Sequence, residues 1–543
     1  SLIVSPLLPQ EFHGDQGEGR TVPLRPPGVD AHRISKESGL TEGHWWQRGK
    51  DLFLTTSLTE SPLAPDYDRS AMTTGIVHIG VGGFHRAHQA AYIDRLIRER
   101  SRSGATEDNC LDWGICGVGL LPGDARMRDA LAGQDHLYTL VLKHLGGRHE
   151  PTIIGSIHDY LFAPDDPEAV LSLMSEPTTR IVSLTVTEGG YNVDDATGEF
   201  RTETPGAVHD AEHPGEPMTA FGYIVEALRR RRAAGTTPFT VMSCDNLPGN
   251  GTVARTAVVS QAAMSDPELA DWIDANVAFP SSMVDRITPQ TTPTDMVELR
   301  RGLGVEDAWP VVCEPFTQWV LEDDFPAGRP PYEEVGVQMV DDVVPYELMK
   351  LRLLNASHQG LGHWGRLLGM TYGHEAAADD DIATWVRTYL EREALPRLLP
   401  VPGIDLAEYV DTLFERFTNA SIADTLERLA FFGPSGMPKF VLPTVRDNLA
   451  AGGSIRLGAA LCAAWSLGVL GTDENGRPIP RVDDLRPLAE RQEAGDETAF
   501  IADEEIFGDL AENERFRTTY LEELAALRSQ GARARMRALV ADV

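Results

Sequence analysis

A lysine, an asparagine and a histidine on one short segment are residue types that can exchange a proton with an alcohol. Lys350, Asn355 and His358 lie in the segment Pro345–His358, and proline is favoured in the first turn of a helix. At 100° per residue, these three side chains and Glu347 share a sector of about 140°. A neutral lysine would accept the hydroxyl proton, while the asparagine and histidine would hydrogen-bond the oxygen as hydride leaves the carbon. An arginine could not replace this lysine, because it stays protonated in proteins.

A structural role for the same residues stays open. The sector that these side chains share could be an ordinary polar helix face, in which Glu347 and Lys350 form an ion pair. Lysine is nevertheless rare in this chain, which has 48 Lys and Arg residues together. The lysines are Lys36, Lys50, Lys143, Lys350 and Lys439. Since arginine is the usual cation here, a surviving lysine is a weak indication of a proton-transfer task.

A glycine-rich turn stands between an apolar run and a helical segment. Gly80, Gly82 and Gly83 would allow a tight turn and the close approach of a pyrophosphate. His85 occupies the place of the third glycine of the usual dinucleotide fingerprint, so an ordinary strand-to-helix turn stays an alternative. A metal site at His78, His85 and His88 is not expected, because His78 alternates into the strand. The candidate cofactor-binding residues of this turn are Gly80, Gly82, Gly83, Phe84, His85 and Arg86.

Asp124 follows the next apolar run along the chain. An acidic side chain there would accept hydrogen bonds from an adenosine ribose and repel a 2′-phosphate, which favours NAD over NADP. Asp124 lies further from Gly82 than the usual spacing of about 20 residues, so the polar stretch 98–112 must be an insertion. A solvated loop acid is the alternative.

Four short apolar runs alternate with helical segments and predict a parallel α/β sheet. Each run ends in small or polar residues, and the carboxyl ends of parallel strands are where such folds bind ligands. The runs are 75–80, 113–120, 180–186 and 239–242. From about residue 345 the pattern is mostly helical. The fold class expected is therefore α/β, with a Rossmann-type dinucleotide-binding domain followed by a mostly α-helical C-terminal domain. The expected bounds are 1–70 for a partly irregular extension with a turn near Trp45 and Trp46, 71–340 for the NAD-binding domain and 341–543 for the helical substrate and catalytic domain.

Composition excludes several partners. The chain has 543 residues with 48 Lys and Arg against 82 Asp and Glu, a formal net charge of −34. Nucleic acid and anionic membrane surfaces are therefore unlikely partners. The apolar run Leu457–Thr472 is shorter than the about 20 residues that cross a bilayer, so a buried helix is expected. The five scattered cysteines and the lack of a convincing signal peptide predict a cytoplasmic protein.

Several long motifs in order resemble the polyol-specific long-chain dehydrogenase/reductase (mannitol dehydrogenase) family. The motifs are GIVHIGVGGFHRAHQAAY (75–92), SLTVTEGGY (183–191), FTVMSCDNLPGNG (239–251), MVDRITP (283–289), WPVVCEPFTQWVLEDDF (309–325) and PYELMKLRLLNASH (345–358). The resemblance covers about seven-eighths of the chain. It implies an NAD-dependent, metal-independent oxidation of D-mannitol at C2 to D-fructose, and the reverse reduction.

The resemblance also implies roles for single residues. Lys350 would be the general base in oxidation and the general acid in reduction, Asn246 and Asn355 would form the oxyanion hole, and His358 would orient the substrate. Glu188 would link the lysine to solvent. The implied substrate-binding residues are Asp285, Glu347 and Arg428, and the implied cofactor ligands are the glycine turn and Asp124.

Two departures and several alternatives remain. About 50 N-terminal residues exceed the usual start of the family, and Gly436 stands where relatives often carry lysine, which leaves one polyol contact open. A sister activity on D-arabinitol, sorbitol or fructuronate is the nearest alternative. A non-catalytic dinucleotide sensor and a metal hydrolase are more distant ones. The expected partner is a small polyol or ketose, and the chain is expected to be a monomer or a small homo-oligomer.

Overall fold

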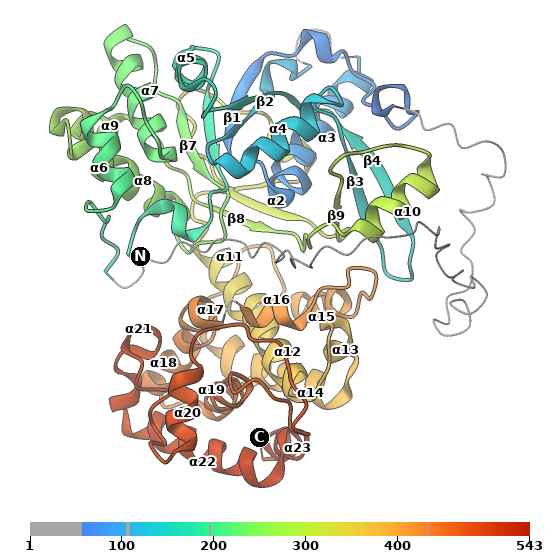
Figure 1. Cartoon of the computed structure of the whole chain (residues 1–543), viewed down its shortest axis with the longest axis vertical. Helices are drawn as coiled ribbons and strands as arrows, with labels where there is room; N and C mark the ends of the chain where they lie inside the picture. Colours follow the sequence, from blue (N-terminus) through green and yellow to red (C-terminus); the bar gives the residue numbers. More distant parts are fainter. Residues whose placement is uncertain (1–56, 105–108, 195–196, 432, 543) are drawn as a thin grey trace, which may run out of the picture. The chain divides into compact units, whose positions relative to one another are not determined.

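A five-stranded parallel sheet organises the first half of the chain (Figure 1). The computed structural model describes residues 57–104, 109–194, 197–431 and 433–542. The strand order is β5-β2-β1-β6-β7, in which β1 lies at the centre and the chain moves outward first on one side and then on the other. This is the order expected of a dinucleotide-binding sheet, and it confirms the predicted fold class. The strands are β1 (Thr74–Ile79), β2 (Gly114–Gly119), β5 (Ile157–Phe162), β6 (Ile181–Leu184) and β7 (Thr240–Ser243).

Both faces of this sheet are buried, because successive side chains along each strand point to opposite faces and both sets are mainly apolar. Ile76 pairs in register with Ile181, and both pack in the core on the side of α3 (Gln89–Arg102). The next residues, Val77 and Val182, form the following pair and pack in the core on the side of α7 (Ala220–Ala234). Strands covered on both faces read as continuous apolar runs, which is why these segments could be recognised in the sequence.

Two small sheets and further helices complete the α/β half. The order β4-β3-β9 forms one sheet and β11-β10-β8 the other. Their strands are β3 (Tyr138–Lys143), β4 (His149–Ile154), β8 (Ser282–Asp285), β9 (Val311–Cys313), β10 (Gln318–Glu322) and β11 (Gln338–Val340). The remaining helices of this half are α2 (Gly83–Ala87), α4 (Ala125–Ala132), α5 (Pro167–Ser175), α6 (Pro205–Glu212), α8 (Asn250–Ala263), α9 (Pro267–Asn276) and α10 (Pro293–Leu303).

The second half is helical and has its own core around Trp364, Trp385 and Trp465, each fully buried. Figure 1 shows α11 where this half meets the α/β half. The helices are α11 (Val344–Met349), α12 (Ala356–Leu367), α13 (Gly373–Ala378), α14 (Asp380–Tyr389), α15 (Leu406–Phe417), α16 (Leu426–Phe431), α17 (Gly433–Phe440), α18 (Leu442–Ala451), α19 (Arg456–Gly468), α20 (Arg486–Glu493), α21 (Glu504–Phe507), α22 (Glu514–Gln530) and α23 (Ala532–Ala541).

One local difference from the sequence-based expectation affects the lysine segment. Between α11 and α12 the chain forms a π-helical turn, Lys350–Asn355, instead of continuing as a regular α-helix. A π-turn adds a residue to the turn, and such turns often occur at functional sites. The side chains on either side of it are therefore rotated relative to the regular spacing of 100° per residue.

Other expectations fall partly outside the described residues. Residues 1–56 of the predicted extension, including Trp45 and Trp46, lie there. The apolar run 457–472 is found largely in α19, a buried helix as predicted. None of the helices in the described part of the chain is long and apolar enough to cross a membrane.

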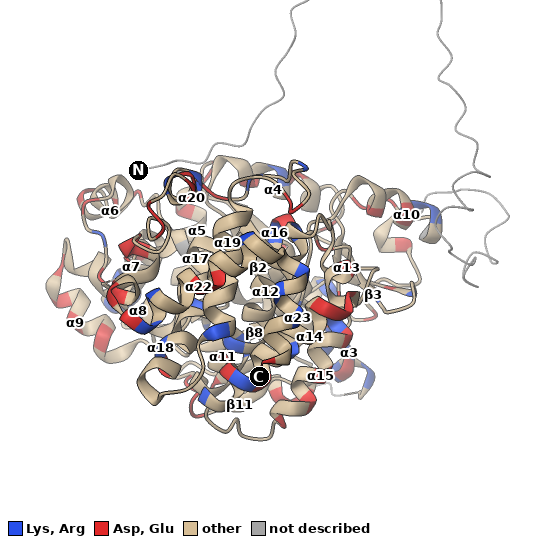
Figure 2. Cartoon of the chain, turned by 90° about the horizontal axis from the view of Figure 1, so that it is seen from below, with Lys and Arg blue, Asp and Glu red and all other residues tan. Residues whose placement is uncertain are grey.

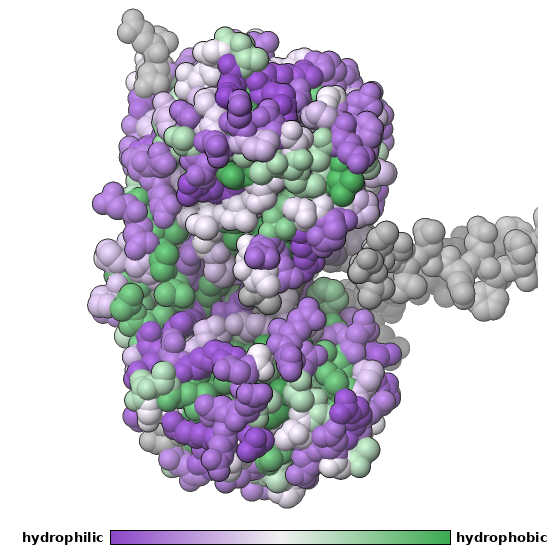
Figure 3. Space-filling view, turned by 90° about the vertical axis from the view of Figure 1, so that its left-hand side faces the viewer, coloured by the Kyte–Doolittle hydropathy of each residue, from purple (hydrophilic) through white to green (hydrophobic). Residues whose placement is uncertain are grey.

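Acidic and basic residues are interspersed along the helices. Figure 2 shows this on the side of the molecule that faces downward in Figure 1. On the face drawn in Figure 3, hydrophilic residues predominate over both halves, and hydrophobic residues show at the level between the halves and in places within the lower half.

Gly80, directly after β1, offers a test of how closely the ends of β1 and β6 pack. Its φ is +95°, and a Cβ there would lie 2.2 Å from the carbonyl oxygen of Thr185. Gly80→Ala is expected to cost about 3 kcal/mol of unfolding free energy, because it adds backbone strain to an overpacked contact. Thermal unfolding measures the effect as a lower midpoint. Gly215→Ala is the control, since Gly215 is exposed and a Cβ added there would meet no atom within 4 Å. Equal midpoints for the two variants would contradict this account.

Candidate functional site

A cavity of about 470 Å³ lies at the carboxyl ends of β1, β6 and β7 and is closed by residues of the helical half. Most of the predicted site residues line it, although they come from distant parts of the sequence. They are Gly80, Gly82, Gly83, Phe84, His85, Asn246, Asp285, Lys350, Asn355, His358 and Arg428. The structure therefore brings the predicted cofactor turn and the predicted catalytic helix to one cavity.

The amine of Lys350 is buried at the base of this cavity. Its Nζ donates to Oδ1 of Asn246 at 2.5 Å and to the carbonyl oxygen of Val284 at 2.7 Å. Burial lowers the pKa of Lys350; Arg416 acts in the same direction, and Asp285 and Glu347 oppose it. A lowered pKa increases the fraction of neutral amine at a given pH, which a general base requires.

Two asparagine amides line the cavity together with the lysine. Asn246 uses its oxygen to accept from Lys350, so its NH₂ group is left to donate to an oxygen in the cavity. Oδ1 of Asn355 is buried and has no hydrogen-bond partner among the described residues. Because rotation of an amide by 180° exchanges its oxygen and nitrogen, Asn355 can also present an N–H donor. Two donors beside a basic amine can stabilise developing negative charge on an alcohol oxygen.

His358 lines the same cavity and is neutral over the physiological range. Burial lowers its pKa to about 4. Its ring lies 5.0 Å from the ring of Phe417, measured between centroids. A neutral imidazole has one donor and one acceptor nitrogen, so His358 can orient a hydroxyl group without carrying charge.

Glu347 does not line the main cavity. Its carboxylate oxygens accept from the backbone N–H of Gly249 at 3.2 and 3.1 Å. With Lys350 and Asn246 it lines a second, very small cavity of about 10 Å³. Burial raises the pKa of Glu347 to about 7. The alternative of a Glu347–Lys350 ion pair is not what the structure shows, since the two side chains have these separate partners.

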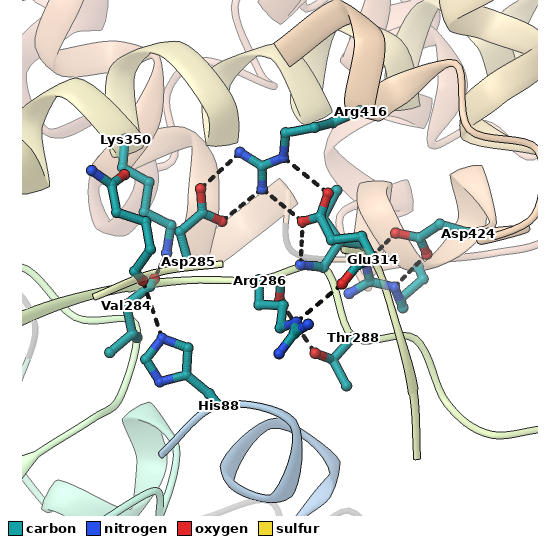
Figure 4. Close-up of polar contacts among 12 residues, drawn as sticks. His88, Val284, Asp285, Arg286, Thr288, Glu314, Lys350, Arg416 and Asp424 are labelled. Carbon is teal, nitrogen blue, oxygen red and sulfur yellow. Dashed lines mark hydrogen bonds and ion pairs between the residues drawn. The ribbon is translucent and has the colours of Figure 1, made fainter. Parts of the chain in front are cut away.

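Asp285 is held by a residue that the sequence analysis missed. Both of its oxygens accept from Arg416 of α15, at 2.8 and 2.9 Å. Arg416 also donates to both oxygens of Glu314, at 3.0 and 2.8 Å (Figure 4). Although burial acts to raise it, Arg416 and Lys350 hold the pKa of Asp285 below its usual value. Glu314 lay within a quoted motif, but nothing in the sequence pointed to Arg416.

Asp245 is a second residue that the analysis missed, although it lies in the SCDN motif. Its carboxylate accepts from the backbone N–H groups of Val186 and Thr187 and from the hydroxyl of Tyr191, at 2.9, 3.0 and 2.8 Å. Thr187 has φ +63° and ψ 169°, a conformation that only glycine adopts readily. Asp245 thus holds a strained segment at the wall of the cavity, directly before Glu188, whose side chain lies outside the described part.

The glycine turn fits a pyrophosphate. A Cβ at Gly82 would have its nearest neighbour at 3.9 Å and one at Gly83 at 3.8 Å, so both backbones border open space. Arg86 does not line the cavity. Its guanidinium is buried, donates to the carbonyl oxygens of Gly82 and Trp309 and lies over the ring of Tyr138. It supports the turn from behind.

Asp124 lies where a dinucleotide-binding sheet places its ribose-binding acid, after the strand next to β1. One of its carboxylate oxygens accepts from the backbone N–H groups of Leu120 and Leu121, each at 2.9 Å. These bonds fix the carboxylate and leave its other oxygen for a ribose hydroxyl. The described residues at this edge of the sheet therefore fit NAD.

Two cationic side chains stand at the helical wall of the cavity. Arg428 of α16 lines it and is ion-paired with Asp424. Gly436 of α17 is closely packed, since a Cβ there would lie 2.8 Å from the ring of Phe440. Lys439, three residues further along α17, lines the cavity. Helix α17 therefore presents a lysine side chain to the cavity at Lys439 and none at Gly436.

Residues 74–334 match the mannitol dehydrogenase Rossmann domain, and residues 342–528 match the mannitol dehydrogenase C-terminal domain. A mannitol 2-dehydrogenase of Cereibacter sphaeroides is 46% identical over 487 residues, which cover 89% of this chain and 100% of that protein. A mannitol 2-dehydrogenase of Phaeosphaeria nodorum is 44% identical, with 88% of this chain and 83% of that protein covered.

Two solved structures are also similar. Pseudomonas fluorescens mannitol 2-dehydrogenase in a ternary complex with NAD and D-mannitol is 46% identical with a TM-score of 0.80, over 88% of this chain and 96% of that one. A D-sorbitol dehydrogenase in substrate-free form is 38% identical with a TM-score of 0.77, over 87% of this chain and 96% of that one.

The raised pKa of Glu347 makes a prediction about stability. Between pH 4.5, the ordinary value, and about 7, the folded chain keeps a proton on Glu347 that the unfolded chain releases. Stability therefore falls as pH rises through this window, by at most about 3 kcal/mol from this group. Glu347→Gln lacks the titration, so its stability relative to the parent should increase between pH 5 and pH 8. Denaturant unfolding at both pH values measures this, and a difference that does not change with pH would contradict it.

Proposed function

The chain belongs to the mannitol dehydrogenase family, and from this premise we propose that it is an NAD-dependent mannitol 2-dehydrogenase. It oxidises D-mannitol at C2 to D-fructose and catalyses the reverse reduction. The observation that carries the proposal is the buried amine of Lys350, which donates to Asn246 in a cavity that Asn355 and the glycine turn also line. The similarity to a relative solved with NAD and D-mannitol supports the same substrate and cofactor.

The lysine performs the acid–base step in this proposal. In oxidation, neutral Lys350 accepts the proton of the C2 hydroxyl while the C2–H bond breaks and the carbonyl bond forms. NAD, when bound, supplies the acceptor for the hydride. Asn246 and Asn355 donate to the oxygen while it carries negative charge, and His358 orients the neighbouring hydroxyl. In reduction, the ammonium of Lys350 returns the proton to the oxygen. No metal takes part.

The surroundings of the lysine suit this task. Burial lowers the pKa of Lys350, so the neutral base is present at a lower pH than for a solvated lysine. Oxidation is accordingly favoured at higher pH and reduction at lower pH. Glu188 is proposed as the link for the released proton to solvent, and Asp285, Glu347 and Arg428 as the groups that position the substrate or support its contacts.

Cofactor choice and location complete the proposal. Asp124 would bind the adenosine ribose and disfavour a 2′-phosphate, which makes NAD the preferred dinucleotide. All five cysteines lie in the described part of the chain, are buried and form no disulfide there, which suits a cytoplasmic enzyme. We further propose a monomer or a small homo-oligomer.

Substitution of the lysine separates catalysis from binding. Lys350→Met is expected to abolish turnover, by about a thousandfold or more, because it removes the general base and its hydrogen bonds to the cavity. Lys350→Arg keeps the charge but stays protonated, so it should be equally inactive. NADH binding, followed by quenching of tryptophan fluorescence, should persist in both variants. Turnover at the parent rate in either variant would contradict the mechanism.

A substrate panel tests the activity. NAD or NADP is offered with D-mannitol, D-sorbitol and D-arabinitol, and formation of reduced cofactor is followed by absorbance. D-mannitol with NAD is expected to give the highest kcat/KM. A higher value with D-sorbitol or D-arabinitol would assign a sister activity, as would faster consumption of NADH with fructuronate than with fructose. Binding of NADH without turnover of any of these compounds would indicate a dinucleotide sensor.

A further inference from the structure

A buried arginine from the helical half joins two carboxylates of the α/β half beside the proposed base. Arg416 lies on α15, Asp285 ends β8 and Glu314 follows β9. The side chains of Arg416 and Asp285 are 4% and 3% exposed, and that of Glu314 is 3% exposed. Figure 4 shows the guanidinium between the two carboxylates, with Lys350 on the far side of Asp285.

The geometry leaves Arg416 a single orientation. One edge of its guanidinium binds both oxygens of Asp285, and another binds both oxygens of Glu314. Its central carbon lies 3.9 Å from the centroid of the Phe316 ring, so the planar group is also stacked. Bidentate contacts of this kind fix direction as well as distance, which a lysine could not do.

Glu314 extends this support to the wall of the cavity. One of its oxygens accepts from the backbone N–H of Ile287 at 2.6 Å, and its carbonyl oxygen accepts from Arg286 at 3.0 Å. The segment that follows Asp285 is thereby fixed. It carries Thr288, whose methyl group lies 3.8 Å from the position of a Cβ on Gly83. Arg416 is therefore connected to both the substrate side and the cofactor side of the cavity.

Charge balance gives the arrangement a chemical consequence. Two buried carboxylates share one cation, so Arg416 carries one positive charge against two negative ones. Asp285 lines the cavity next to Lys350, and each of its oxygens keeps a lone pair for a substrate hydroxyl after binding Arg416. The charged or titratable groups around the lysine are Asp285 of β8, Glu347 of α11, Arg416 of α15, His358 of α12, the pair Arg428–Asp424 at α16, His88 before α3 and, along the wall of the same cavity, His85, Asp245, Arg286 and Lys439.

We propose that Arg416 is a positioning residue of the reaction, which holds the carboxylate of Asp285 fixed beside the Lys350 amine by dividing its hydrogen bonds between Asp285 and Glu314. This inference rests on the proposed function, because it assigns Asp285 a substrate hydroxyl. Arg416 touches neither substrate nor cofactor in this role. Its effect reaches the reaction through the orientation of Asp285 and through the charge next to the lysine.

The variant Arg416→Gln is expected to change both KM and the pH profile of kcat/KM, which a purely structural change would not do. Loss of the arginine frees Asp285, so KM for D-mannitol should rise about tenfold or more. It also leaves negative charge uncompensated near Lys350, so the pH at which kcat/KM for oxidation reaches half its maximum should move up by about one pH unit. Arg387→Gln is the matched control, since Arg387 pairs with Asp411 on the exposed surface of the same half. This control should leave both quantities unchanged.

A charge-matched pair of variants separates the two effects. Glu314→Gln leaves Arg416 with one carboxylate and should move the pH profile downward, opposite to Arg416→Gln. The double variant Arg416→Gln with Glu314→Gln restores the net charge, so its pH profile should return to that of the parent. Its KM should stay raised, because Asp285 remains unsupported.

The proposal can be tested even if one of the single variants does not fold. A folded Arg416→Gln variant with the parent's KM and pH profile would overturn it, as would a double variant whose pH profile stays shifted. If Arg416→Gln does not fold, an unchanged pH profile in Glu314→Gln overturns it. If the parent does not oxidise D-mannitol, the proposed function fails separately. In that case the pKa of Lys350 is followed without turnover, by NMR of lysines labelled with ¹³C at Cε. An equal pKa of Lys350 in the parent and in Glu314→Gln overturns the inference.

Discussion

Burial of one amine constrains how the two halves of this protein meet. The ammonium or amine of Lys350 comes from the helical half, yet its hydrogen-bond partners, Asn246 and the carbonyl oxygen of Val284, belong to the α/β half. A buried amine without partners would be costly, so the two halves must keep this distance. The same burial lowers the pKa of Lys350, which is the property a general base needs. Stability and chemistry thus depend on one contact.

The charges around this amine are arranged so that none is left without a partner. Asp285, a carboxylate that lines the cavity, is ion-paired with Arg416, which also pairs with Glu314. Glu347 lies on the other side and is bound by the backbone N–H of Gly249 rather than by the lysine. Removing one member of a buried ionic group is far more damaging than its net contribution suggests, because the partner stays charged and buried. A substitution at any one of these charged residues is therefore expected to affect the others.

The parts of the site that depend on local spacing were predictable from the sequence. The strand runs, the glycine turn and the placement of Lys350, Asn355 and His358 on one helical segment all follow from short-range periodicity. Arg416 was not predictable, because it lies 131 residues from Asp285 and reads as one more cation on an amphipathic helix. The π-turn at Lys350–Asn355 has no local signature either, and it changes the rotation between the side chains before the turn and those after it.

The central claim is that Lys350 is a buried base with a lowered pKa, and its rarity makes this directly measurable. The chain has five lysines, so a sample labelled with ¹³C at lysine Cε gives a small set of NMR signals. The signal that disappears in Lys350→Met identifies the residue, and its chemical shift is followed from pH 6 to 11. A buried base with a lowered pKa should give a signal that titrates clearly below the ordinary lysine pKa of about 10.4. Titration of the Lys350 signal at or above that value would contradict a lowered pKa for this amine.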